Sequence, residues 1–273
     1  MRTKKDVINT MTSIMAEVVS IICGLILPRL ILGAFGSSYN GITSSITQFL
    51  SCIVLLRAGV GSVTRAALYN PLSKKDKSEI SGIVNATAIF MKKVALIYVG
   101  ALIVFACVYP FLVRNSFSWI FSATLVLIIG SSTFVDNYFG IAYQMLLQAD
   151  QKNYVNTIPQ IVTTILNTIV AAVLIHCGAG IHLVKLGSAI VYFIRPLFLS
   201  YYVKKKYEID ADIKPNNSAI SQRWDAFAQQ AAAFVNNNTD VIVLTMFSDI
   251  KEVSVYTVYY MVANGYNKKY ELV

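Results

Sequence analysis

Long apolar runs separated by short polar connections dominate the pattern of this chain. A bilayer is crossed by a helix of ~20 predominantly apolar residues. Seven runs reach that length, and an eighth begins near residue 253 and stops soon afterwards. The seven runs cover residues 7–34, 41–68, 94–113, 117–149, 154–177, 181–203 and 224–247. The pattern therefore predicts an all-α polytopic membrane protein.

Two polar segments interrupt this pattern. In residues 76–91, apolar positions recur at helical spacing between charges, which predicts an amphipathic helix on the cytoplasmic interface. Residues 204–221 are polar and contain a Pro-Asn-Asn sequence, which predicts a cytoplasmic linker after six spans. We therefore expect a six-span N-terminal lobe over residues 1–203, followed by this linker and by the start of a second lobe over residues 222–273.

A loose internal repeat is consistent with two lobes. The segment LILGAFGSSYNGITSSI (30–46) aligns with LTMFSDIKEVSVYTVYYM (244–261), which places Phe35 on Phe247. Each segment holds the end of one span, a short turn and the start of the next span. Internal repeats are typical of transporters built from two related halves. Because the residues after the linker are too few for a second set of spans, we expect the chain to be truncated early in the second lobe.

Composition and charge agree with a membrane protein. The chain has 273 residues, of which 56% are hydrophobic and 14% are charged, with a mean hydropathy of +0.59. Soluble domains carry roughly 25% charged residues. The net charge of +9 gathers in alternate connections between the spans, so membrane topology explains it without a nucleic-acid partner. The positive-inside bias of these connections places the N-terminus in the cytoplasm.

The sequence carries no motif for a metal, a nucleotide or a cofactor. The four cysteines lie in or beside apolar runs without CxxC spacing, and the two histidines fall near one turn. No GxxxxGK[ST] motif is present to bind nucleotide phosphates. We therefore expect no metal site, no cofactor and no direct use of ATP.

Ionisable residues inside the apolar runs are the strongest candidates for function, since a charge at the bilayer centre costs roughly 2.5–3.5 kcal/mol on insertion scales. Arg57 lies in the run CIVLLRAGVG, and Glu17, Asp136 and Arg195 lie in three other spans. A helical rise of ~1.5 Å per residue places these four residues ~12–20 Å from the cytoplasmic ends of their spans. Two interpretations stay open: they line an aqueous cavity, or they neutralise one another, with Arg57 pairing with Glu17 or Asp136.

Uncharged polar residues form stripes along several spans. Gln48 lies in the second predicted span, Asn167 in the fifth and Asn236 in the seventh, where Asp240 follows one turn later. Small and hydroxyl residues commonly mediate helix packing in membranes. That interpretation stays open beside one in which the stripes face a central cavity.

Several segments resemble one family of transporters. The segments NGITSSITQFLS, LLRAGVG, RAALYNPL and NTDVIVLTMFSDIKEVSVYTVYYMVANG are similar to the polysaccharide-exporting flippases of the multidrug/oligosaccharidyl-lipid/polysaccharide exporter superfamily. The resemblance covers nearly the whole chain. It implies two lobes around a central cavity and alternating access. It also implies transport of a polyprenyl-diphosphate-linked oligosaccharide across the bacterial cytoplasmic (inner) membrane, for O-antigen, capsule or exopolysaccharide synthesis.

The resemblance also implies roles for residues and partners. Cationic residues in the cavity would meet the diphosphate, which the planar fork of an arginine suits. The expected partners are the lipid-linked oligosaccharide, membrane lipids, and glycan polymerase or assembly proteins or a separate second half. The candidate site residues are Arg57, Arg195 and Arg29 for the diphosphate, Glu17, Asp136 and Asp240 as cavity carboxylates or ion-coupling groups, and Gln48, Asn167 and Asn236 as polar lining.

Three alternatives compete with the flippase hypothesis. A cation-coupled multidrug exporter of the same fold would use Glu17, Asp136 or Asp240 as its coupling carboxylate. A membrane enzyme, such as a polysaccharide polymerase or ligase, is disfavoured because every outer connection is short, so we expect no enzyme. A non-functional fragment is the third alternative, since half of a two-lobe transporter would expose polar stripes to lipid.

Overall fold

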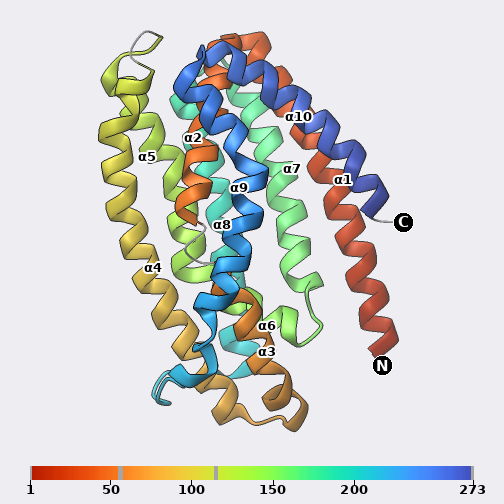
Figure 1. Ribbon diagram of the computed structural model, residues 1–273. Coiled ribbons are helices and arrows are strands. Elements are labelled where there is room, and N and C mark those ends of the chain that lie inside the picture. The colour runs from red at the N-terminus through yellow and green to blue at the C-terminus, as the bar shows by residue number, and fades with distance from the viewer. Residues whose placement is uncertain (1, 55–57, 114–115, 272–273) are drawn as a thin grey trace.

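The computed structural model describes residues 2–54, 58–113 and 116–271. Within these ranges the regular elements are ten α-helices, one π-helical turn and one short 3-10 helix, and no strand occurs (Figure 1). This confirms the predicted all-α class. The α-helices are α1 (Arg2–Phe35), α2 (Ser37–Val54), α3 (Ala58–Lys74), α4 (Lys77–Leu112), α5 (Trp119–Val135), α6 (Ile141–Ala149), α7 (Tyr154–His176), α8 (Ile181–Tyr207), α9 (Arg223–Phe247) and α10 (Ile250–Glu271).

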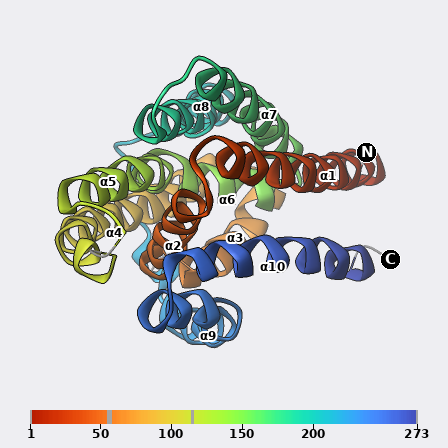
Figure 2. The ribbon, with the colours of Figure 1, turned by 90° about the horizontal axis from the view of Figure 1, so that it is seen from above.

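The helices form an elongated bundle with most axes near the long direction of the molecule (Figure 1). Seen along that direction, α7 and α8 lie on one side and α9 on the opposite side, with α2 between them (Figure 2). The helices α1 and α10 extend outward in the same direction, so the two ends of the chain lie on one side of the molecule (Figure 2).

Five stretches of helix are long and apolar enough to cross a membrane. They are Lys5–Phe35, Lys77–Leu112, Trp119–Ala149, Tyr154–His176 and Ile181–Tyr207. Large apolar side chains on them face outward: Leu96 is 66% exposed, Phe111 64% and Ile120 71%. A continuous exposed apolar surface of this kind is unfavourable in water and favourable against the hydrocarbon of a bilayer. These five helices indicate a multi-pass membrane protein.

Two of the seven predicted spans, 41–68 and 224–247, do not coincide with any of these five stretches, which were identified among the described residues. The first is described as two helices of 18 and 17 residues, α2 and α3, on either side of residues 55–57. The second corresponds to α9, whose sequence carries Gln-Gln and Asn-Asn-Asn. Amide side chains lower the mean hydropathy of this helix below that of a typical span.

Residues 76–91 do not form the separate interfacial helix that their pattern predicts. They are continuous with the next span in α4, which is 36 residues long. Ile80 and Ile83 belong to a hydrophobic cluster with Leu146 of α6 and Leu199 of α8. The apolar face of this segment is therefore buried against protein.

The predicted linker is an ordered segment, here called the strap (residues 208–216), that packs along the first half of α4. Asn85 of α4 donates from Nδ2 to the carbonyl oxygen of Ile213 at 3.1 Å. The backbone N–H of Asn216 donates to the carbonyl oxygen of Gly82 at 3.0 Å. A Cβ atom at Gly82 would lie 3.3 Å from a strap carbonyl oxygen, so a glycine suits this close approach.

Two helical hairpins match the internal repeat at their turns. The helix α1 ends at Phe35 and α9 ends at Phe247, the two residues that the repeat alignment superposes. The next helix follows after a short turn in both hairpins. Gly36, with φ +89°, occupies the first turn, and Ser248 has extended backbone in the second. A positive φ favours glycine, because glycine has no Cβ atom to clash.

The helices α2 and α10 pack through small and polar residues. Asn40 donates from Nδ2 to Ser254 Oγ at 2.9 Å in a buried contact. Gly41 faces the carbonyl oxygen of Ile250 so closely that a Cβ atom would clash with it. This packing fixes the start of α10 against the α1–α2 hairpin.

Candidate functional site

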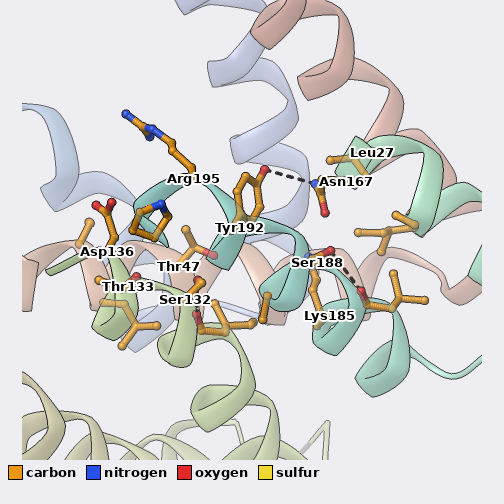
Figure 3. A pocket seen from close by; sticks show the side chains of 18 residues that line it. Leu27, Thr47, Ser132, Thr133, Asp136, Asn167, Lys185, Ser188, Tyr192 and Arg195 are labelled. Atoms are coloured by element: carbon orange, nitrogen blue, oxygen red, sulfur yellow. Dashed lines mark hydrogen bonds between the residues drawn. The ribbon is translucent and has the colours of Figure 1, made fainter. Parts of the chain in front are cut away.

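A cavity of about 520 Å³ lies between α1, α2, α5, α7 and α8 (Figure 3). We call it the first cavity. Three charged side chains line it, together with hydroxyl and amide groups. The polar lining consists of Thr47, Ser51, Ser132, Thr133, Asp136, Asn167, Lys185, Ser188, Tyr192 and Arg195. Such a lining suits a ligand that carries both charge and hydroxyl groups.

A second cavity of about 560 Å³ adjoins the first and is lined by α1, α2, α9, α10 and one residue of α8. Both cavities share Leu27, Ile31, Thr47 and Lys185 in their walls. Polar residues from α1, α2 and α10 face the second cavity, including the predicted site residues Glu17 and Gln48. The two cavities therefore form adjacent parts of one polar interior.

Lys185 of α8 lies where the two cavities meet, and it was not among the site residues predicted from the sequence. Its side chain is half-buried. Within the described ranges, the lysines that form ion pairs are Lys77 and Lys152, and no carboxylate lies within ion-pair distance of the Lys185 ammonium group. A half-buried cation without a carboxylate partner favours an anionic ligand or water.

Arg195 lies on the same helix and is held by a hydrogen-bonded partner. Its Nε and Nη2 groups donate to Asn156 Oδ1 of α7 at 3.3 and 2.9 Å. Lys185 precedes it by about three turns, which separates the two backbone positions by ~15 Å. In Figure 3, Arg195 and Asp136 lie on one side of Tyr192, and Lys185 lies on the other. The first cavity therefore has a cation toward each end.

Asp136 reaches the first cavity from a π-helical turn. This turn (Asp136–Gly140) interrupts the apolar stretch between α5 and α6. The Nε2 group of Gln144 donates to Asp136 Oδ1 at 2.9 Å. Single π-turns within α-helices occur frequently at functional sites, because they shift the direction of the side chains that follow. The turn thus provides a carboxylate on the wall of the cavity.

Asn167 of α7 leaves one polar atom without a partner. Its side chain is buried, and its Nδ2 group donates to the hydroxyl of Tyr192 at 3.2 Å (Figure 3). No group in the described part of the chain donates to its Oδ1 atom. A buried acceptor left unpaired costs ~1–3 kcal/mol. Asn167 lines the first cavity, but this oxygen itself has almost no exposed surface in this conformation.

The remaining predicted site residues lie elsewhere. Arg29 is exposed and lines neither cavity, and its contact with a diphosphate stays a prediction. Asp240 is also exposed and accepts a hydrogen bond from the hydroxyl of Tyr256 at 2.5 Å, away from both walls. Arg57 and the side chain of Asn236 lie outside the described residues. The predicted pairing of Arg57 with a carboxylate stays a prediction for the same reason.

Comparison with known proteins gives a likeness of fold. No family model and no curated protein matches the chain. A solved structure described as "protein A" is similar, with a TM-score of 0.66 at 14% sequence identity. The match covers 96% of this chain and 61% of that chain, so this chain spans less than two thirds of its length. At this identity the likeness concerns the fold alone.

Proposed function

We propose that the chain is part of a transporter that moves a polyprenyl-diphosphate-linked oligosaccharide across the bacterial cytoplasmic membrane. The observation that carries this proposal is the first cavity, which places Lys185 and Arg195 among hydroxyl and amide groups inside a bundle of apolar helices. A diphosphate requires cationic partners, and an oligosaccharide offers many hydroxyl groups for hydrogen bonds. The lining provides both kinds of contact.

The two cations would act at successive points on the path of the diphosphate. Lys185 lies near the start of α8 and Arg195 lies about three turns further on, toward the lysine-rich end of the helix. If that end is cytoplasmic, as the positive-inside bias predicts, the diphosphate meets Arg195 first and Lys185 later. The guanidinium can hold two phosphate oxygens at once, whereas the ammonium acts as a point charge.

The proposal includes two lobes. Residues 1–203 would form the first lobe, and the second would begin with α9 and α10 after the strap. The matching turns of the α1–α2 and α9–α10 hairpins support this division. The second cavity lies where the two hairpins face each other, so relative movement of the lobes would open or close it.

A second candidate is a cation-coupled exporter of the same fold. Asp136 favours it, because a carboxylate on the wall of a membrane cavity can bind a proton or a metal cation and can attract a cationic drug. The two candidates differ in the charge of the cargo. A flippase requires Lys185 and Arg195, whereas a drug exporter requires the carboxylate.

Ligand binding to the purified chain in nanodiscs tests the proposal. We expect the oligosaccharide linked to polyprenyl diphosphate to bind at least tenfold more tightly than the same glycan on an uncharged polyprenol, because charged hydrogen bonds contribute ~1.5–3 kcal/mol each. Lys185→Ala and Arg195→Ala should each weaken binding roughly tenfold or more, by the same reasoning.

The matched control is Lys206→Ala, which removes an exposed lysine from the end of the same helix and should leave binding unchanged. Equal affinity for the charged and uncharged lipids would contradict the proposal. Tight binding of cationic dyes that is lost in Asp136→Asn, with no binding of the lipid diphosphate, would establish the second candidate instead.

A further inference from the structure

A smaller pocket of about 290 Å³ is lined by α4, the π-turn, the start of α6, α8 and the strap, and it shares no residue with either cavity. Its wall includes one lysine from α4 and one from α8, and the ring of Tyr138 lies beside the first lysine. The Nζ atom of Lys92 is 5.5 Å from the centroid of that ring. Lys204, in the last turn of α8, is the second lysine. The lining residues of this pocket are different from those of the first cavity.

The pocket lies where the lipid-facing surface ends. After Lys92 along α4, the outward side chains are apolar, with Leu96 66% exposed and Ile97 59% exposed. Before Lys204 along α8, Leu197 is 51% exposed. On the other side of the two lysines lies the polar strap. Lysines at such a boundary extend their ammonium groups into the headgroup layer while their alkyl chains stay against apolar surface.

Neighbouring acidic groups do not neutralise these lysines. Both side chains are exposed, and within the described ranges the ion pairs are those of Lys77 with Glu208 and Lys152 with Asp150. The strap carries further carboxylates near α4, of which one accepts a hydrogen bond from the strap backbone. Two lysines that form no ion pair within the described ranges therefore face one small pocket, and the ring of Tyr138 lies beside one of them.

We infer that this pocket binds the phosphate headgroup of an anionic phospholipid, with the acyl chains along the apolar face of α4. Basic pockets between membrane helices on the cytoplasmic side suit anionic headgroups, because lysines near the membrane surface attract the negative phosphate. Ile89 and Phe139 add apolar surface to the pocket wall, which a free phosphate ion would leave unused.

A bound headgroup would link three parts of the molecule. Lys92 belongs to α4, Lys204 to α8, and the wall is completed by the strap and by Tyr138 of the π-turn. That turn also carries Asp136, which lines the first cavity. A lipid in this pocket therefore contacts the backbone segment that positions the cavity carboxylate, and it binds independently of any transported substrate.

Native mass spectrometry of the full 273-residue chain tests this inference. The protein is delipidated in detergent and titrated with phosphatidylglycerol or phosphatidylcholine. We expect retention of one phosphatidylglycerol at concentrations where phosphatidylcholine is released. The double variant Lys92→Gln and Lys204→Gln should weaken this retention roughly thirtyfold, because it removes the attraction of both ammonium groups.

Two further variants separate this site from general attraction and from misfolding. Lys205→Gln with Lys206→Gln removes the same charge from neighbouring exposed positions and should retain the lipid. Lys92→Arg with Lys204→Arg keeps the charge and should also retain it. The inference is overturned by equal retention of both lipids, by equal loss in the control variant, or by displacement of the lipid by inorganic phosphate at similar concentration.

Discussion

The two faces of α8 differ sharply although they belong to one helix. The inner face lines the first cavity and carries Lys185, Ser188, Tyr192 and Arg195 at helical spacing. The outer face consists of exposed apolar side chains: Leu183 56%, Leu186 42%, Ile190 56%, Ile194 47% and Leu197 51%. The difference shows that a membrane helix tolerates a charge on the face that points toward the protein interior. The orientation of the helix about its own axis therefore matters more than its average hydropathy.

The physical basis of this difference is solvation. Hydrocarbon offers a charge no hydrogen bonds, so an ionised side chain on the outer face costs roughly 2.5–3.5 kcal/mol on insertion scales. On the inner face, Arg195 donates to Asn156 Oδ1, and the cavity has room for water or a ligand.

The largest effect is expected from a charge on the outer face. Ile190→Asp places a carboxylate against lipid and should remove most of the folded protein from the membrane, at a cost of roughly 2.5–3.5 kcal/mol. Ser188→Asp places the same group on the inner face, one turn from Lys185, where opposite charges attract. The amount of monodisperse protein recovered from membranes measures both. Equal recovery of the two variants would contradict the assignment of the faces.

A smaller effect is expected where one helix packs on another. Gly41→Ala introduces a Cβ atom that clashes with the carbonyl oxygen of Ile250, and overpacking of this kind costs ~1–3 kcal/mol. Gly33→Ala is the matched change on an open face, since no atom lies within 4 Å of its Cβ position. Thermal unfolding in one detergent should show a lower midpoint for the first variant and an unchanged or higher midpoint for the second.

Asn167→Leu should separate stability from binding. The change removes the hydrogen bond to Tyr192, which contributes ~0.5–1.5 kcal/mol, and it also removes a buried unpaired acceptor that costs ~1–3 kcal/mol. We expect the free energy of unfolding to change by less than about 1 kcal/mol, while affinity for the lipid-linked oligosaccharide falls several-fold. A large loss of stability with unchanged affinity would assign Asn167 to packing alone.

The smallest effect on stability is expected from removing a solvent-exposed ion pair. Lys77 contacts Glu208 at 2.6 Å with both side chains 71% exposed, and the ammonium holds the pKa of Glu208 below its ordinary value. The contact therefore stabilises the fold above the ordinary glutamate pKa, and this contribution disappears as pH falls through the lowered one. Glu208→Gln should lower the unfolding midpoint slightly at neutral pH and not at all in strong acid, as measured by scanning calorimetry.

Much of the fold follows from the sequence, because a bilayer accepts few backbone structures. Uninterrupted apolar runs must form helices in hydrocarbon, so the positions of most long helices could be read directly. The same logic selected Asp136, Asn167 and Arg195, since polar groups inside apolar runs must face protein or a cavity. The turns at Gly36 and Ser248 agree with a repeat that sequence similarity shows only loosely.

The orientation of each helix about its axis, and the contacts between helices, are harder to predict from the sequence. Lys185 lies near the start of its helix and was not selected from the sequence, although its spacing to Ser188 and Arg195 matches one helix face. Arg29 was selected through the family resemblance, and the structure exposes it. The amphipathic pattern of residues 76–91 predicts an apolar face, but the pattern is the same whether that face packs against lipid or, as here, against other helices.

The most direct measurement of the central claim is the accessibility of cysteines on the two faces of α8. In a chain whose four cysteines are replaced, Ser188→Cys and Ile190→Cys are reacted with a charged, membrane-impermeant maleimide in open membrane fragments. We predict rapid labelling at position 188, protection by the lipid-linked oligosaccharide diphosphate, and no labelling at position 190. Equal labelling at both positions, or labelling at 188 that the ligand leaves unchanged, would contradict a polar substrate cavity at this site.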